Sequence, residues 1–298
     1  MNLELRHLRY VVAVADLLSF TCAAKRLHMS QPALSARIRS VERHLGVNLF
    51  HRTTRTVTLT AAGADFAARA RDILQLLDEA ERECRNSAHG IVVRVGYFGA
   101  AACEATPAIM DAFQADHPGV EVELCRYDWA DPTAGLRGRE VQLSFIRPPM
   151  DTGGLRLLTL SVDPRVAALP SSHPFADRET VDVADLLADP VIYRASSDRV
   201  WVDFWYGAEA RAGTDPPRRI EVRNLDDELH TVAAGRAISL TTACAELYFP
   251  RPGVSYVPLT GLPLSPLVLA WRADDQNPLT HAFVAAARAY VESRRKSL

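Results

Sequence analysis

Residues 5–46 carry the pattern that most limits what this chain can fold into. Apolar residues recur there at helical intervals in three short successive segments. Ser19 and Ser30 precede the second and third segments in the position of helix N-caps, and Gly46 ends the third. Two short helices joined by a tight turn, the second opening with Ser-Gln-Pro, predict a helix-turn-helix.

Charge is distributed unevenly along the chain. The totals are nearly balanced, with 34 Lys+Arg and 36 Asp+Glu. Residues 1–60, however, hold nine basic and three acidic residues (net +6), whereas residues 91–298 hold 21 and 27 (net −6). A basic head on an acidic body indicates that the head binds a polyanion. The alternative is a cluster of solvated arginines with no partner.

The third helical segment has one apolar stripe and leaves polar side chains on its other faces. Its positive N-terminus and short polar residues suit a DNA major groove, where N-terminal residues reach base edges. Residues 54–60 then alternate β-branched side chains, which predicts a β-wing carrying phosphate or minor-groove contacts. The alternative is a surface helix whose arginines are only solvated.

A long helix is expected to follow, capped by Thr60 and reaching about residue 88. Its apolar or small residues recur at intervals of four and three, which is a coiled-coil seam. At 1.5 Å per residue, about 28 residues span roughly 42 Å, and a helix of that length usually pairs with another copy. The alternative is packing against its own body. The seam residues are Phe66, Ala70, Ile73, Leu77, Ala80 and Cys84.

A dense motif connects these elements. It runs from Phe20 to Gly63 as F-T-x-A-A-x-x-L-x-x-S-Q-P-A-L-S-x-x-I-R-x-x-E-x-x-L-G-x-x-L-F-x-R-x-x-R-x-x-x-L-T-x-A-G. This stretch resembles the winged helix-turn-helix of LysR-type transcriptional regulators. The resemblance implies a homo-oligomer that binds a double-stranded DNA operator and responds to a small-molecule effector. It also implies a dimer through the linker helix, and a tetramer of such dimers.

The resemblance assigns the S-Q-P-A-L-S helix to DNA reading and the arginine after L-F to the wing. One position departs from the pattern: many members have Arg directly after the second Ser, and here it is Ala36, followed by Arg37. A methyl group can contact thymine but cannot bind guanine through two hydrogen bonds. The candidate DNA-binding residues are Thr21, Ser30, Gln31, Pro32, Ser35, Arg37, Arg39, Arg52, Thr53 and Arg55.

Beyond residue 90, strands and helices are expected to alternate in two sets, which favours parallel-rich sheets with helices on both faces. The resemblance implies a periplasmic-binding-protein-like effector domain. The expected strands are 91–95, 120–127, 141–146, 165–169, 183–187, 191–193, 219–223, 237–240, 255–258 and 267–271. The expected helices are 104–116, 132–137, 199–213, 225–235 and 278–295.

The domain organisation follows from these elements. A winged helix-turn-helix domain is expected over 1–60, a linker and dimerisation helix over 61–90, and an effector-binding domain over 91–298. Within the last, subdomain I would hold 91–161 and 267–298, and subdomain II would hold 162–266.

Ligands in open α/β sheets bind beyond the carboxyl ends of the strands. The expected strand ends carry aromatic rings, two guanidinium groups and several hydroxyls, a mixture that suits a small aromatic or unsaturated carboxylate. Gly99 and Ala100 stand where the family often has Ser or Thr, which leaves more room and fewer donors. The candidate effector-binding residues are Phe98, Gly99, Ala100, Trp129, Arg147, Arg194, Ser196, Asn224 and Thr241.

Several of these residues also have a structural interpretation. Asn224 with Asp227 forms a capping-box pattern, and Ser196 or Ser197 can cap the helix expected near 199. Trp129 can be a core residue, and Arg147 a surface residue held by two following prolines.

The sequence lacks the motifs that several classes of enzyme require. The only lysines are Lys25 and Lys296, neither in a phosphate-binding G-K-[ST] motif nor placed for a Schiff base. H-E-x-x-H and G-x-S-x-G are absent, and the nine histidines show no ligand spacing. We therefore expect no enzyme, cofactor or metal.

The five cysteines form no C-x-x-C motif, and a reducing cytoplasm is the expected setting. No apolar run is long enough for a bilayer, and the N-terminal residues do not form a signal peptide, so no membrane association is expected. A thiol-based redox sensor stays an alternative. Peroxide-sensing members of the family have a cysteine pair near the stretch that is 196–208 here; no Cys lies there, and Cys244 is alone in subdomain II.

Overall fold

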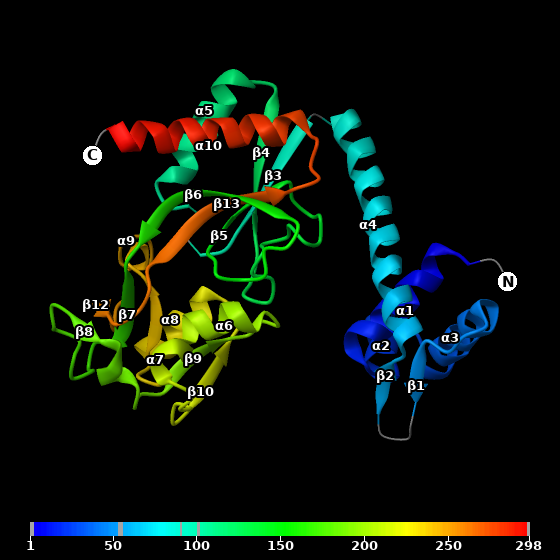
Figure 1. Cartoon of the computed structure of the whole chain (residues 1–298), viewed down its shortest axis with the longest axis horizontal. Coiled ribbons are helices and arrows are strands. Elements are labelled where there is room, and N and C mark those ends of the chain that lie inside the picture. The colour runs from blue at the N-terminus through cyan, green and yellow to red at the C-terminus, as the bar shows by residue number, and fades with distance from the viewer. Residues whose placement is uncertain (1–2, 53–55, 90, 100–101, 297–298) are drawn as a thin grey trace. The chain divides into compact units, whose positions relative to one another are not determined.

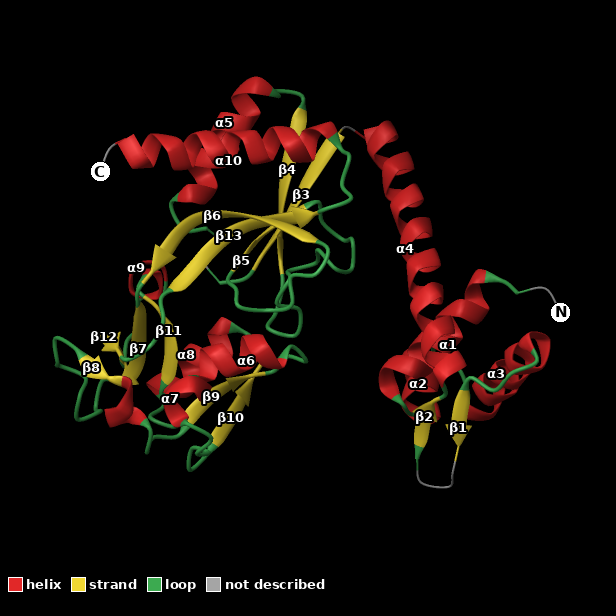
Figure 2. Cartoon of the chain, in the orientation of Figure 1, coloured by secondary structure: helices red, strands yellow, loops and turns green. Residues whose placement is uncertain are grey.

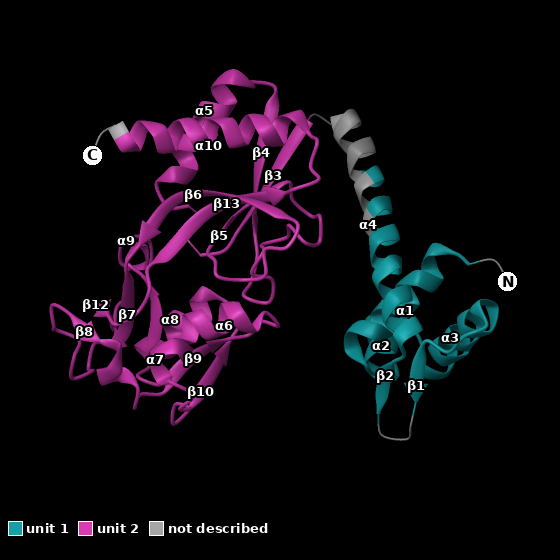
Figure 3. Ribbon diagram, in the orientation of Figure 1, with its two compact units in different colours: residues 1–89 teal, residues 90–298 magenta. Residues whose placement is uncertain are grey.

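The computed structural model describes residues 3–52, 56–89, 91–99 and 102–296 (Figure 1). The chain divides into two compact units, residues 1–89 and 90–298 (Figure 3). Thr53, Arg55 and Ala100, three of the predicted site residues, lie outside the described residues. No helix in the described part is long and apolar enough to cross a bilayer.

The first unit is a helix-turn-helix followed by a two-stranded wing and a long helix. The elements are α1 (Leu5–Leu17), α2 (Phe20–Arg26), α3 (Gln31–Leu45), β1 (Phe50–Arg52), β2 (Val57–Leu59) and α4 (Ala61–His89). β1 and β2 pair antiparallel.

Local capping explains where these helices begin and end. The Ser19 hydroxyl accepts a hydrogen bond from the Cys22 amide at 3.3 Å, and the Ser30 hydroxyl accepts one from Ala33 at 3.4 Å. Thr60 does the same for the Gly63 amide at 2.9 Å, which starts α4. Gly46 ends α3 at φ 72°, a left-handed conformation that favours glycine.

The core of this unit lies between the three short helices. The apolar stripe of α3 meets α1 and α2 there, and Ala67 of α4 joins the same cluster. The side chains that are fully buried in it are Val11, Val14, Ala23, Leu34, Ile38, Val41, Leu49 and Ala67.

The second unit contains two separate sets of strands (Figure 2). The first set is a five-stranded sheet in the order β4-β3-β5-β13-β6, which with α5 and α10 we call subdomain I. β3 pairs parallel with β4 and β5, and β13 pairs antiparallel with β5 and β6. The elements are β3 (Ile91–Tyr97), α5 (Ala105–Asp116), β4 (Val120–Arg126), β5 (Leu143–Ile146), β6 (Leu155–Asp163), β13 (Ser265–Arg272) and α10 (Pro278–Lys296).

Subdomain II holds a four-stranded sheet, β11-β7-β12-β8, and a parallel pair, β10-β9. Its strands are β7 (Arg165–Pro170), β8 (Val181–Asp182), β9 (Val191–Arg194), β10 (Arg219–Val222), β11 (Ser239–Thr242) and β12 (Val254–Thr260). Its helices are η1 (Val183–Leu186), α6 (Arg199–Tyr206), α7 (Ala208–Arg211), α8 (Leu225–Ala233) and α9 (Cys244–Tyr248).

The chain passes between the two subdomains at two neighbouring points. Pro164 separates β6 from β7, and residues 261–264 separate β12 from β13. Asp163 and Ser265 are partners in the β6–β13 register, so the two crossings lie side by side.

Two local predictions were wrong, one strand was missed, and the helix expected at 199–213 is divided at Gly207 into α6 and α7. The helix expected at 132–137 is a series of turns, because the Asp131 carboxylate accepts hydrogen bonds from the Thr133 and Gly135 amides and Gly135 has φ 86°. The strand expected at 183–187 is a 3₁₀ turn, which Asp182 caps through the Ala184 amide. The strand β6 was not expected at all, because the consecutive Leu157 and Leu158 interrupt its apolar alternation.

Candidate functional site

The N-terminal end of α3 presents an exposed polar surface. Gln31 and Pro32 form the first turn of α3, and Arg37 lies further along it. Short polar groups at a positively polarised helix end can approach the edges of bases. Six of the predicted DNA-binding residues are exposed: Thr21, Ser30, Gln31, Pro32, Arg37 and Arg39.

Ser35 and Arg52 instead belong to a half-buried network that joins the wing to α3. The Ser35 hydroxyl, only 8% exposed as a residue, accepts hydrogen bonds from Arg39 and Arg52, each at 3.1 Å. Arg52 also forms an ion pair with Glu42 at 2.8 Å and lies 4.4 Å from the centre of the Phe20 ring. Burial lowers the pKa of Arg52, and Glu42 opposes that shift. Both side chains therefore have structural partners inside this unit.

Glu42 is the centre of this network. One of its carboxylate oxygens accepts hydrogen bonds from the Leu49 and Phe50 amides at 3.0 and 3.2 Å, and the other contacts Arg52. The carboxylate thus fixes the start of β1 against α3. Glu42 is off the apolar stripe of α3 in the sequence, yet it is only 8% exposed.

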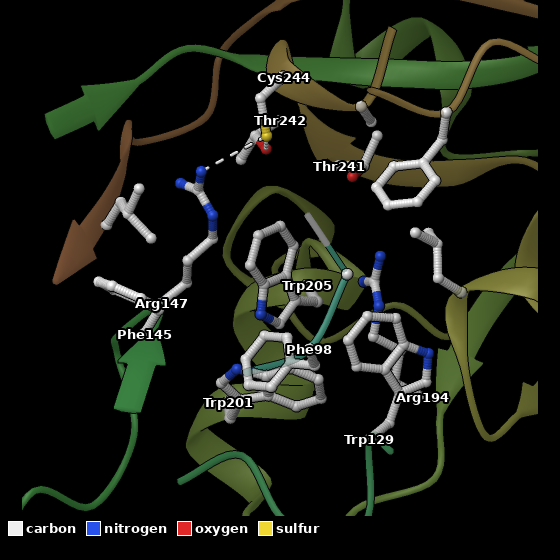
Figure 4. Close-up of a pocket in the computed structure, with 15 residues that line it drawn as sticks. Phe98, Trp129, Phe145, Arg147, Arg194, Trp201, Trp205, Thr241, Thr242 and Cys244 are labelled. Atoms are coloured by element: carbon white, nitrogen blue, oxygen red, sulfur yellow. Dashed lines mark hydrogen bonds between the residues drawn. The ribbon is translucent and has the colours of Figure 1, made fainter. Parts of the chain in front are cut away.

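A cavity of about 60 Å³ lies between the two subdomains of the second unit (Figure 4). Aromatic rings make up much of its wall: Phe98 is 5.3 Å from Trp129 and 5.9 Å from Trp201, measured between ring centres. The lining residues are Phe98, Gly99, Trp129, Phe145, Arg147, Arg194, Trp201, Trp205, Leu225, Thr241, Thr242, Cys244, Ala245, Phe249 and Leu267.

Arg147 connects this cavity to the crossing between subdomains. It follows β5 and is nearly buried. Its guanidinium forms an ion pair with Asp163 at 2.5 Å and donates to the Ser265 carbonyl at 3.4 Å. It therefore contacts both chain segments that pass between the subdomains.

Arg194 lies on the opposite wall, in subdomain II, and is paired inside the protein. It forms an ion pair with Glu228 of α8 at 2.8 Å, and both side chains are buried. The Glu228 oxygen in this pair also accepts a hydrogen bond from Ser239 at 2.6 Å. Burial lowers the pKa of Arg194, and Glu228 opposes that shift.

A third guanidinium, Arg165, stands behind the cavity. It is 1% exposed and donates to the carbonyls of Thr241 and Phe204 at 3.3 and 3.4 Å. It forms no ion pair with a carboxylate among the described residues. Burial, together with Arg194 and Arg147, lowers the pKa of Arg165 to about 9.

Three tryptophans line the cavity, Trp129, Trp201 and Trp205. Their indole nitrogens are buried and have no hydrogen-bond partner among the described residues.

The strand-end rule placed some residues in the cavity and misplaced others. Phe98, Gly99, Trp129, Arg147, Arg194 and Thr241 line it, as expected. Asn224 and Ser196 do not. Asn224 caps α8 through the Asp227 amide at 2.9 Å, and Ser196 accepts a hydrogen bond from the Asp198 amide at 3.2 Å.

Nine of the fifteen residues that line the cavity were not predicted, and neither was the buried Arg165 near them. Trp201 and Trp205 lie four residues apart on α6, a spacing that puts two large rings on one helix face and could have been noticed. Thr242 and Cys244 directly follow the predicted Thr241. Arg165 gave no signal, because its burial depends on packing between distant segments.

Comparison with known proteins identifies the family. One family model, described as "Bacterial regulatory helix-turn-helix protein, lysR family", matches residues 5–64, and another, "LysR substrate binding domain", matches residues 88–292. The chain belongs to the LysR family of transcriptional regulators. The predicted family and fold class are confirmed.

Relatives match this LysR-type regulator over nearly their whole length. It is 32% identical to the HTH-type transcriptional regulator AlsR of Bacillus subtilis, covering 95% of this chain and 94% of AlsR. It is 31% identical to the Hca operon transcriptional activator HcaR of Escherichia coli, covering 98% and 99%. Both relatives are regulators and not enzymes.

Solved structures agree with this assignment. The crystal structure of CbnR, a LysR family transcriptional regulator, is 27% identical with a TM-score of 0.61, covering 97% of this chain and 99% of that one. Full-length CbnR complexed with its target DNA is 28% identical with a TM-score of 0.53, covering 97% and 100%. The chain is therefore a DNA-binding transcriptional regulator with an effector-binding domain.

Proposed function

We propose that this regulator binds a small carboxylate in the cavity between subdomains I and II. The observation that carries the proposal is the pair of guanidinium groups on opposite walls of the cavity, Arg147 and Arg194 (Figure 4). A carboxylate can accept charge-assisted hydrogen bonds from both.

The size of the cavity restricts this carboxylate. Its volume is about 60 Å³, whereas an engineered cavity that holds benzene has about 150 Å³. A carboxylate of a few heavy atoms fits this cavity without any movement of the subdomains. An aromatic carboxylate requires the subdomains to separate about the crossings at 163–165 and 260–265.

Calorimetry with the full-length protein tests whether the ligand is a carboxylate anion. The panel should pair short aliphatic, unsaturated and aromatic carboxylates with their neutral amides. Arg147→Ala should weaken carboxylate binding by about one to two orders of magnitude, because a hydrogen bond to a charged group contributes about 1.5–3 kcal/mol. Arg251→Ala is the matched control, since Arg251 pairs with the exposed Asp226 away from this cavity. Amides that bind as well as carboxylates would contradict the proposal.

We propose that the operator is read by the exposed end of α3. Gln31 and Pro32 would reach base edges, Ala36 would contact a thymine methyl, and Arg37 and Arg39 would bind phosphates. Ser35 and Arg52 would hold the wing in place through Glu42, in addition to any contact with DNA. Thr53 and Arg55 stay candidates for backbone contacts.

Selection from a randomised operator library tests this assignment. Gln31→Ala should change the selected sequence, whereas Arg37→Ala should weaken binding to all sequences alike. An unchanged selection for Gln31→Ala would remove α3 from base reading.

We propose that α4 joins two copies into a dimer, and that dimers associate into tetramers. Ile73 and Leu76 of α4 are 47% and 62% exposed, and Leu77 is partly buried. A second α4 would cover these side chains and place two helix-turn-helix units on one operator. In this scheme residues 1–60 bind DNA in the cytoplasm, 61–90 dimerise and 91–298 bind the effector.

Effector binding would alter DNA binding by changing the arrangement of the two subdomains. A ligand that binds one arrangement of the subdomains more tightly shifts the population toward it. The shift would change the spacing of the paired DNA-binding units.

A further inference from the structure

Two cysteines that are far apart in the sequence meet at the boundary between the subdomains. Cys103 precedes α5 of subdomain I, and Cys244 is the first residue of α9 in subdomain II. Both are free thiols and partly exposed. Both line a second cavity, of about 190 Å³, with Ser161, Asp163 and Tyr248 among its other wall residues.

Cys244 has the surroundings of a reactive thiol. The Arg147 guanidinium lies 3.6 Å from its sulfur, and the Thr242 hydroxyl lies 3.3 Å from it. A hydrogen bond with Cys103, and then the Arg147 charge, outweigh burial and lower the pKa of Cys244 to about 6. The lowered pKa favours the thiolate of Cys244, which is the nucleophilic form.

Cys103, in contrast, is held in its protonated form. The same hydrogen bond raises its pKa, and burial raises it further, so Cys103 keeps its proton. Oxidation of Cys244 removes the thiolate charge that raises the pKa of Cys103, so Cys103 can then lose its proton and attack the oxidised sulfur.

We propose that Cys244 and Cys103 form a redox pair in which a hydroperoxide oxidises Cys244 and Cys103 then closes a disulfide between the subdomains. In the first step the Cys244 sulfur attacks the peroxide oxygen, the O–O bond breaks, and the products are Cys244 sulfenic acid and one molecule of alcohol or water. In the second step the Cys103 sulfur displaces the sulfenic hydroxyl, which leaves as water with the Cys103 proton. The two thiols together lose two electrons, and the peroxide gains them.

This pair differs from the cysteines sought in the sequence. The stretch 196–208 contains no Cys, and Cys244 was taken to be alone because its partner belongs to the other subdomain. The disulfide would fix the turn before α5 to α9. The pair shares Cys244 and its neighbour Arg147 with the first cavity.

Peptide mapping of the full-length protein tests the pair. Reduced protein is treated with hydrogen peroxide near stoichiometry, its remaining thiols are alkylated, and non-reduced digests are examined by mass spectrometry. We expect a cross-linked peptide pair containing Cys103 and Cys244 that has lost two hydrogens. Sulfenic or sulfinic acid accumulating at Cys244 without this cross-link would overturn the proposal, as would oxidation of Cys125 at the rate of Cys244.

Serine variants separate the two roles. Cys103→Ser should stop at a Cys244 sulfenic acid that dimedone traps. Cys244→Ser should slow the oxidation of Cys103 at least about tenfold, because burial still raises the pKa of the remaining thiol. Cys125→Ser is the matched control: Cys125 is also partly exposed, on β4, and burial raises its pKa, so its loss should leave the cross-link unchanged.

A pH profile of alkylation gives an independent measurement on the unmodified protein. The rate of iodoacetamide reaction at Cys244 should rise with pH to half its maximum near pH 6, the pKa of that thiol. A midpoint above pH 8 would show an ordinary thiol and refute the redox pair.

Discussion

Glu228→Gln should strongly destabilise the second unit. Glu228 is fully buried and pairs with Arg194, which is itself 4% exposed. The substitution keeps the size of the side chain but leaves the Arg194 charge without a counterion. Removing one partner from a buried ion pair costs about 3–5 kcal/mol.

Tryptophan fluorescence can follow this change in the full-length protein. All four tryptophans, Trp129, Trp201, Trp205 and Trp271, lie in the second unit, so urea unfolding read by fluorescence reports that unit alone. With a denaturant dependence of about 2–3 kcal/mol per molar urea, the midpoint should fall by about 1–2 M.

A neighbouring substitution provides the control. Asp226→Asn lies on the same helix and also removes a carboxylate from an arginine pair, but Asp226 is 67% exposed. Water screens an exposed pair, so the midpoint should shift little. Equal shifts for the two variants would refute the argument that burial makes the Arg194–Glu228 pair important.

Three further predictions concern the first unit. Gly63→Ala should destabilise it by about 1–3 kcal/mol, because a Cβ there would collide with the Leu49 carbonyl. Thermal unfolding measures this change. Gly119→Ala, in the second unit, should have little effect on unfolding, because a Cβ there would meet no neighbouring atom. Leu77→Asp should yield smaller species in sedimentation, because a dimer would bury the added carboxylates, and unchanged assembly would place Leu77 outside the interface. The logarithm of operator affinity should fall linearly with the logarithm of salt concentration, with a slope of about 0.9 for each phosphate contacted. Arg37→Ala should lower that slope by about one. An affinity that does not change with salt would contradict phosphate binding.

The sequence was most informative where structure is local. Ser19, Ser30 and Thr60 accept hydrogen bonds from the first turns of their helices, and Gly46 has the left-handed conformation that ends α3. Each of these features involves residues within four positions of one another. The helix-turn-helix could therefore be derived from caps and apolar spacing, and the dense motif then indicated the family.

The cavity could be derived only in part. The strand-end rule led to Arg147 and Arg194, but not to Asp163 and Glu228, which pair with them. It also could not distinguish Thr241, whose side chain lines the cavity, from Asn224, whose side chain caps α8. Asn224 lies just after β10 and Thr241 near the end of β11, and only the direction of the side chain separates their roles.

Long-range pairings left no sequence signal. Ser35 and Arg52 looked like surface residues, but they share hydrogen bonds because β1 folds back onto α3. Cys103 and Cys244 come together only when two subdomains assemble. Such contacts depend on tertiary packing, which local spacing does not encode.

The adjacent crossings make subdomain II an exchangeable module. Asp163 and Ser265 stand opposite each other on antiparallel strands, so a two-residue hairpin turn could join β6 directly to β13. The shortened chain would keep the five-stranded sheet with α5 and α10, provided that Phe98 and Trp129, which it would uncover, became polar. A foreign sensing domain whose ends lie equally close could be grafted at the same junction, giving a regulator with a new input and the same DNA-binding unit.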